Sequence, residues 1–152
     1  MPLVHNEENV RRQSSAFMPR RPVLTGIAVG LATLAPHGFL SPAGSVGYAA
    51  VVISLIAGVY FGFAVMNGSP RDQLVEFCVA GVFAVAALLG FLVWPTWLPI
   101  AYFAHALWDF AHHNRLRFPL VVIPAWYVPW CVVIDVIVGA GLLAIWRAHD
   151  LL

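Results

Sequence analysis

The sequence has few charges and no lysine. Charged residues make up only 10% of its 152 residues, and all eight basic residues are arginine. The formal net charge is +1, so the chain lacks the broad basic surface that binds nucleic acid. The chain is 61% hydrophobic and its mean hydropathy is +0.85, whereas soluble domains are roughly 45 to 50% apolar. The composition predicts a membrane protein with no separate soluble domain.

Cysteine is also scarce. Cys78 and Cys131 lie far apart and inside apolar stretches, which favours two small buried side chains over a disulfide framework. A cleavage site of the A-x-A kind is missing after the basic and apolar N-terminal part. We therefore expect the first apolar segment to be a signal anchor that stays in the protein, and not a cleaved signal peptide.

Five apolar segments follow a polar tail at residues 1–22, and each is close to the roughly 20 residues that a helix needs to cross hydrocarbon. Short connections rich in Gly, Pro, Ser and Asn predict antiparallel neighbours. The longer link at 114–127 has an apolar middle, which predicts a segment in or dipping into the interface. The expected fold is an all-α, five-span bundle forming one domain over residues 23–152. The spans are expected near residues 23–40, 48–66, 74–93, 98–113 and 128–146.

The orientation follows from the arginines, because cytoplasmic loops retain positive charge. With the N-terminus inside, seven of the eight arginines are cytoplasmic and only Arg147 is outside. The C-terminus is then expected outside, and the protein is expected to be a multi-pass protein of the cell membrane. Tryptophans favour the membrane surfaces, which predicts an outer set of Trp94, Trp97 and Trp146 and an inner set of Trp126 and Trp130.

Ionisable side chains cost several kcal/mol in hydrocarbon, so each needs a partner, a cavity or a function. The fourth predicted span carries an unusual number of them. At about 100° per residue they fall within one broad stripe of the helix, opposite Ala104 and Leu107. The stripe consists of Tyr102, His105, Asp109, His112 and His113.

Spacing brings several of these groups within reach of one another. Asp109 is three residues before His112 and four before His113, so the carboxylate can reach either imidazole. On the next span Cys131 and Asp135 are also four apart, and Glu76 is expected at a similar depth. These positions predict a polar site in the cytoplasmic half of the bundle, formed by Glu76, Asp109, His112, His113 and Asp135.

Carboxylates and neutral imidazoles are ligands that a divalent metal such as zinc accepts. With three protein ligands, the metal could bind and activate a water molecule at its open fourth position. The predicted metal ligands are Asp109, His112, His113 and Asp135. The predicted catalytic groups are Asp109, His113 and Asp135. The predicted second shell is Glu76, His105, Tyr102 and Cys131. In the alternative interpretation, His112 and His113 are interfacial, and Asp109 and His105 only hold helices together.

His37 follows Pro36 in the first span and has two interpretations. It could pair with His105 as an axial haem ligand, or it could bond to backbone groups freed by Pro36. The expected depths of the two histidines differ by about one helical turn, which favours the backbone interpretation. Small residues allow helices to approach closely, so contacts between helices are predicted at Gly58, Gly62, Gly139 and Gly141.

The run H-A-L-W-D-F-A-H-H from His105 to His113, followed by C-V-V-I-D from Cys131 to Asp135, resembles a family of small bacterial integral membrane proteins of unknown function. The resemblance covers roughly residues 98–146, about the last third of the chain. It implies that the His, Trp, Asp and Cys residues of the two motifs belong to one shared element, and it implies no reaction.

Two functional hypotheses remain open from the sequence. In the first, the bundle is an enzyme, a metal-dependent hydrolase in its most concrete form, that acts on a lipid-like substrate arriving laterally. In the second, it is a non-catalytic subunit or a small transport or proton-relay protein, with a structural His/Asp stripe. The expected partners are membrane lipid, a hydrophobic substrate, and either a second copy or a larger membrane complex.

Overall fold

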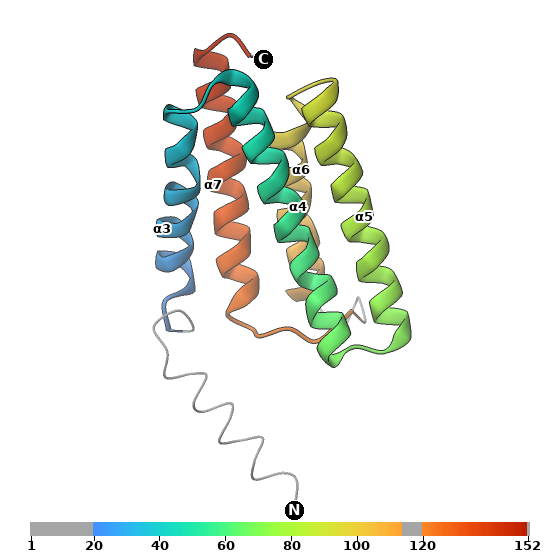
Figure 1. Ribbon diagram of the computed structural model, residues 1–152. Helices are drawn as coiled ribbons and strands as arrows, with labels where there is room; N and C mark the ends of the chain where they lie inside the picture. Colours follow the sequence, from blue (N-terminus) through green and yellow to red (C-terminus); the bar gives the residue numbers. More distant parts are fainter. Residues whose placement is uncertain (1–19, 114–119, 152) are drawn as a thin grey trace, which may run out of the picture.

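The computed structural model describes residues 20–113 and 120–151. These residues form five α-helices and one short 3₁₀ helix, and no strand occurs among them. The helices run alternately in opposite directions along one bundle (Figure 1). The all-α prediction is confirmed. The elements are α3 (Pro22–Leu34), η1 (Ala35–Gly38), α4 (Pro42–Asn67), α5 (Pro70–Leu92), α6 (Trp97–His113) and α7 (Tyr127–Ala148).

Two of the helices begin earlier than their apolar segments suggest, because Ser-Pro pairs start them. Ser41 caps α4 by accepting a hydrogen bond from the Gly44 backbone N–H. Ser69 and Asp72 form a reciprocal capping box at the start of α5. In both cases proline occupies the first helical position, where its missing N–H costs nothing. The first turns are thus helical although their residues are typical of loops.

Three helices, α4, α5 and α7, are long and apolar enough to cross a membrane. The helix α3 has 13 residues and continues into η1 as a shorter apolar segment. The helix α6 has 17 residues, somewhat fewer than the roughly 20 of a typical span. Its polar residues also set it apart from the other helices.

Glycines allow α3 to lie close to α7 (Figure 1). A Cβ atom at Gly26 would lie 2.8 Å from the Trp130 carbonyl oxygen, and one at Gly141 would lie 2.3 Å from Leu34. Helices in lipid gain little from the hydrophobic effect, so such close van der Waals packing carries their association. The predicted contact at Gly141 is confirmed by this packing.

Of the other predicted glycine contacts, one is confirmed and two are not. A Cβ at Gly139 would lie 3.1 Å from the Phe103 ring, which confirms a close approach of α6 and α7. Gly58 and Gly62 have no heavy atom of another helix within 4 Å in the described part of the chain. The prediction of close helix contacts at these two glycines is wrong within the described bundle.

The segment before α7 returns into the bundle without forming a helix. Val121 and Ile123 are buried and pack in one apolar cluster with Tyr60 and Tyr127. Residues 120–126, which were predicted to lie in the membrane interface, thus contribute to the core. The rest of that predicted link, residues 114–119, lies outside the described residues. This segment closes the end of the bundle where α6 ends and α7 begins.

At the opposite end of the bundle, Trp146 is fully buried and donates a hydrogen bond from Nε1 to Ser45 Oγ at 2.8 Å. Trp146 lies in the last turn of α7, as predicted for the end of that span, but its side chain is buried, because an indole with an internal acceptor packs well in the core. Trp94 and Trp97 are exposed at this end, as expected. His37 bonds through Nδ1 to Ser45 Oγ at 2.6 Å, so its partner is a side chain and not the backbone.

Candidate metal centre

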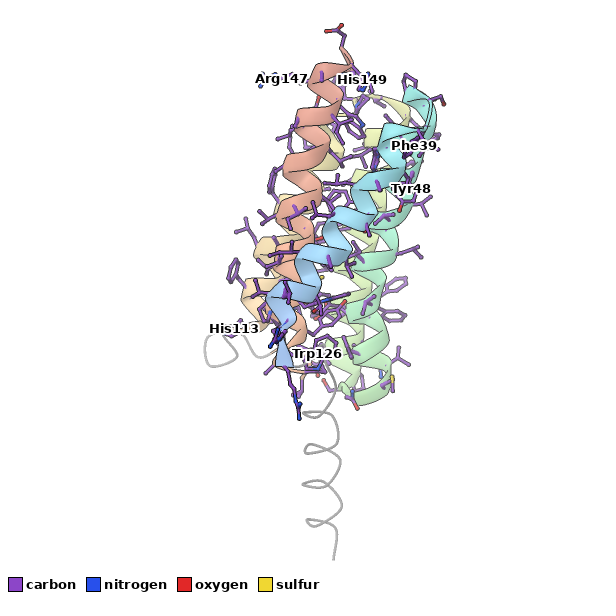
Figure 2. All side chains as sticks on the ribbon, turned by 90° about the vertical axis from the view of Figure 1, so that its left-hand side faces the viewer. Phe39, Tyr48, His113, Trp126, Arg147 and His149 are labelled. Atoms are coloured by element: carbon purple, nitrogen blue, oxygen red, sulfur yellow. The ribbon has the colours of Figure 1, made fainter. Side chains whose placement is uncertain are left out.

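The polar stripe of α6 faces the inside of the bundle. Tyr102, His105, Asp109 and His112 are at most 1% exposed, whereas Leu107 on the opposite face is 69% exposed. His113 is exposed, because it is the last residue of α6 and lies at the end of the bundle (Figure 2). The predicted stripe is thus buried over three turns, and its last member is outside the core.

Two of these residues meet two residues of α7. His105, Asp109, Cys131 and Asp135 each offer one ligand atom, and these four atoms lie within 4.8 Å of one another. On each helix the two members are four residues apart, so both pairs point the same way from adjacent turns. All four side chains are at most 1% exposed. We refer to these four residues as the buried polar group.

Hydrogen bonds connect the members of this group. The distance from His105 Nδ1 to Asp135 Oδ2 is 2.8 Å, and that from the same nitrogen to Asp109 Oδ1 is 3.7 Å. An ionised carboxylate can only accept hydrogen bonds. When Asp135 is ionised, His105 therefore donates to it from Nδ1–H. Cys131 Sγ lies 3.9 Å from Asp135 Oδ2, a weak contact. His105 is therefore held between two carboxyl groups.

The buried polar group has unused bonding capacity. Asp109 Oδ2, Asp135 Oδ1 and His105 Nε2 are buried and have no hydrogen-bond partner among the described residues. A buried polar atom without a partner costs about 1 to 3 kcal/mol. Two free carboxylate oxygens next to an imidazole and a thiol form a donor set that a divalent transition metal accepts.

Tyr60 of α4 completes the surroundings of Asp109. Its hydroxyl donates a hydrogen bond to Asp109 Oδ1, and its ring lies against His112 with centroids 4.3 Å apart. Tyr60 was not among the predicted site residues, although a tyrosine in the middle of an apolar span is a signal of a buried polar contact. Tyr127 has a similar position, with its hydroxyl 4.0 Å from Cys131 Sγ.

His112 belongs to a separate pair with Glu76 of α5. The distance from His112 Nε2 to Glu76 Oε1 is 2.9 Å, and both side chains are buried. Trp108 donates from Nε1 to the other carboxylate oxygen of Glu76 at 3.3 Å. The imidazole is also fixed through Nδ1, 3.1 Å from the Trp108 carbonyl oxygen.

The structure therefore distributes the predicted site residues over four places. Asp109 and Asp135 come together as expected, and His105 and Cys131, predicted to be a second shell, join them directly. His112 and Glu76 form their own pair, and exposed His113 lies apart from both. Tyr102, also predicted in the second shell, donates to the Ala49 carbonyl oxygen at 3.0 Å and connects α6 to α4.

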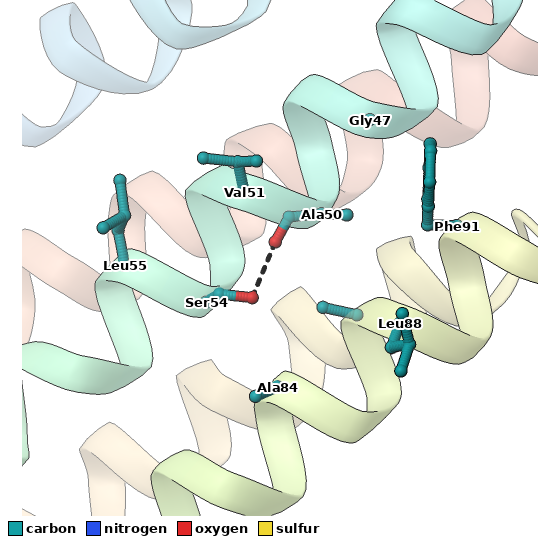
Figure 3. A pocket seen from close by; sticks show the side chains of 9 residues that line it. Gly47, Ala50, Val51, Ser54, Leu55, Ala84, Leu88 and Phe91 are labelled. Atoms are coloured by element: carbon teal, nitrogen blue, oxygen red, sulfur yellow. Dashed lines mark hydrogen bonds between the residues drawn. The ribbon is translucent and has the colours of Figure 1, made fainter.

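A groove between α4 and α5 offers no comparable chemistry (Figure 3). Its volume is about 520 Å³, and its lining is almost entirely apolar, including Val51, Leu88 and Phe91. The hydroxyl of Ser54 donates to the Ala50 carbonyl oxygen at 2.8 Å, so it has no hydrogen left to donate to a ligand. This α4–α5 groove therefore offers a ligand mainly apolar contacts and no donor from Ser54.

Comparison of the chain with known protein families, curated proteins and solved structures found no match. The resemblance to a family of small bacterial membrane proteins stays a prediction. The fold and the site define a protein that is all-helical in its described residues, with three helices long and apolar enough to cross a membrane and a buried His/Asp/Cys group that could hold a metal ion.

Proposed function

We propose that the protein is a five-span membrane protein that holds a divalent transition metal, such as zinc, in the buried polar group. The observation that carries the proposal is the convergence of four ligand atoms within 4.8 Å, two of them carboxylate oxygens. Zinc binds nitrogen and oxygen at about 2.0 to 2.2 Å and sulfur at about 2.3 Å. Ligands around such an ion are roughly 3.4 Å apart, so the 2.8 Å His105–Asp135 contact would open slightly on binding.

Charge balance favours a divalent ion. A net charge inside a membrane is costly because no solvent compensates it. Two ionised aspartates, one neutral histidine and one thiol carry a total charge of −2, which a divalent cation neutralises. Without the ion, Asp109 and Asp135 would have to share or retain protons in place of the metal. The group is therefore better suited to a doubly charged ion than to a monovalent one.

Hydrolysis is the reaction that this site supports best. His105, Asp109 and Asp135 supply one nitrogen and two oxygen ligands. The Cys131 sulfur is 3.9 Å from Asp135 Oδ2, a long contact, so we treat it as a neighbour of the metal site and not as a ligand. Three protein ligands plus one open position is the arrangement of catalytic zinc sites, where the metal lowers the pKa of bound water. The proposed substrate is a lipid-like molecule, because the site is surrounded by helices that can cross a membrane.

Metal analysis of the purified protein tests this proposal. We expect about one equivalent of zinc per chain, and we expect Asp109→Asn to lose it. Glu76→Gln is a matched control, since it also removes a buried carboxylate but lies in the separate pair with His112. Metal that is absent from folded wild-type protein, or lost equally in both variants, would contradict the proposal.

A proton relay is the second candidate, and Tyr60 favours it. This residue contacts Asp109 of the buried polar group through its hydroxyl and His112 of the other pair through its ring. A continuous series of ionisable groups in a membrane is typical of proton pathways. Vesicles containing metal-free protein would then conduct protons, and Asp109→Asn would stop this. Metal-dependent hydrolysis requires no such conductance.

A further inference from the structure

A second groove lies beside the buried polar group, between α3, α4 and α7. Its volume is about 340 Å³, within the range of pockets that bind small molecules. It is lined by Val29 of α3, Val59 of α4, and Trp130 and Cys131 of α7, among others. We refer to it as the α7 groove. It shares Cys131 with the buried polar group, so it lies directly next to that group.

The α7 groove opens on the side of the bundle. The helix α3 packs along α7 and stands apart from α4 over most of its length (Figure 1). Leu55 and Val59, which line the groove on α4, are exposed. Because α4 and α7 are both able to cross a membrane, this opening faces the hydrocarbon and not water. A ligand would reach the groove laterally from the lipid.

The lining is apolar, and one of its residues carries an unused hydrogen-bond donor. Most of its side chains are aliphatic, and the Thr33 hydroxyl donates to the Val29 carbonyl oxygen at 2.8 Å. Nε1 of Trp130 is buried and has no hydrogen-bond partner in the described part of the chain. An indole N–H can only donate, so its missing partner is an acceptor such as a carbonyl oxygen.

The unused donor favours a lipid over another helix as the occupant of the groove. Along α7 the groove extends from Tyr127 to Ile134, about 10 Å at 1.5 Å per residue. The backbone carbonyl groups of a membrane helix are already bonded within that helix, so a helix of a second copy would leave Trp130 Nε1 unpaired. A lipid combines an apolar chain with a free ester carbonyl, which matches both the apolar lining and the donor.

We propose that the α7 groove binds one acyl chain of a membrane lipid, with its ester carbonyl accepting a hydrogen bond from Trp130 Nε1. This position brings the ester to the Cys131 side of the groove, next to the buried polar group. The inference rests on the proposed function for its chemistry, since it names an acyl ester as the substrate class. Lipid binding itself depends only on the groove.

Photolabelling with a lipid tests the proposal. Full-length protein is reconstituted in phosphatidylcholine vesicles that contain a trace of phosphatidylcholine with a diazirine in one acyl chain. After illumination, labelled peptides are identified by mass spectrometry. We expect adducts on the α7 residues of the groove. Val59→Trp, which fills the groove, should reduce these adducts at least fivefold.

Val51→Trp is the matched control, because it makes the same substitution on the same helix but fills the α4–α5 groove (Figure 3). It should leave the α7 adducts unchanged. Trp130→Phe keeps an aromatic ring without the N–H and should reduce labelling by between about twofold and tenfold, the change expected for one hydrogen bond. Equal α7 labelling of wild type and Val59→Trp would overturn the proposal, as would a crosslinked dimer in place of lipid adducts.

Zinc content measured in the same samples separates the two proposals. If the groove is labelled specifically but zinc is absent, the lipid site stands and the metal-dependent function fails. If zinc is present and Val59→Trp changes nothing, the metal site stands and the acyl-chain site fails.

Discussion

The Tyr60 hydroxyl donates a hydrogen bond to Asp109 and so connects two helices through residues 49 positions apart in the sequence. Both side chains are almost completely buried. Tyr60 thereby stabilises one oxygen of Asp109, while the other remains without a partner. The aspartate is thus held in place but still has an oxygen available to a ligand.

Replacing Tyr60 by phenylalanine should destabilise the metal-free protein. Asp109 Oδ1 then loses its closest hydrogen-bond partner, and an unsatisfied buried group costs about 1 to 3 kcal/mol. Thermal unfolding in detergent measures this loss. Tyr48→Phe is the control, since no hydrogen bond of its hydroxyl occurs among the described residues. Equal unfolding temperatures for the two variants would show that the Tyr60 bond contributes nothing.

Replacing individual histidines should identify the metal ligand. His105→Ala is expected to lose bound zinc, because His105 lies between both aspartates. His113→Ala should retain it, because His113 is exposed at the end of α6. Elemental analysis of the two purified variants decides between the structure and the sequence-based ligand set. The reverse result would restore His113 as a ligand.

Zinc should stabilise the folded protein. A ligand that binds only the folded state adds about 2.7 kcal/mol at a free concentration of 100 times Kd. We expect the unfolding temperature of wild-type protein to rise with added zinc and to fall with a chelator. Asp135→Asn should abolish this response. A rise of the same size in that variant would mean that zinc binds elsewhere.

Enlarging Gly26 should weaken the attachment of α3. A Cβ there would lie 2.8 Å from the backbone oxygen of Trp130, so Gly26→Leu must separate α3 from α7. The same change at Gly62 should be tolerated, because a Cβ there would have no heavy atom of another described helix within 4 Å. Proteolysis in detergent, with cleavage near the start of α3 as the readout, compares the two variants. Equal protection of both would contradict this packing.

The predicted topology is testable with a reporter. Five spans place the two ends of the chain on opposite sides of the membrane, and the arginines place the N-terminus inside. A phosphatase fused after Leu152, active only outside the cytoplasm, should therefore be active. The same reporter fused after Asn67 should be inactive, since two spans would precede it. Activity in the second fusion alone would reverse the topology.

Much of the fold could be predicted from the sequence because apolar length and turn residues act locally. The five apolar segments coincide with α3 to α7, and the Ser-Pro pairs at Ser41 and Ser69 only extend two of them. The buried stripe of α6 was equally predictable, since Tyr102, His105 and Asp109 follow the helical period. These features depend on residues within a few turns of one another.

The composition of the site was decided by the tertiary structure. Spacing alone allowed Asp109 to use His112 or His113, and only the packing of α5 and α7 on α6 assigned Glu76 to His112 and Asp135 to His105. Which imidazole meets which carboxylate depends on the rotation and axial offset of neighbouring helices. The rotation and offset are set by contacts between residues distant in sequence, such as the contact of Phe103 with Gly139. The sequence thus determined which residues face inward, and helix packing determined which of them share a site.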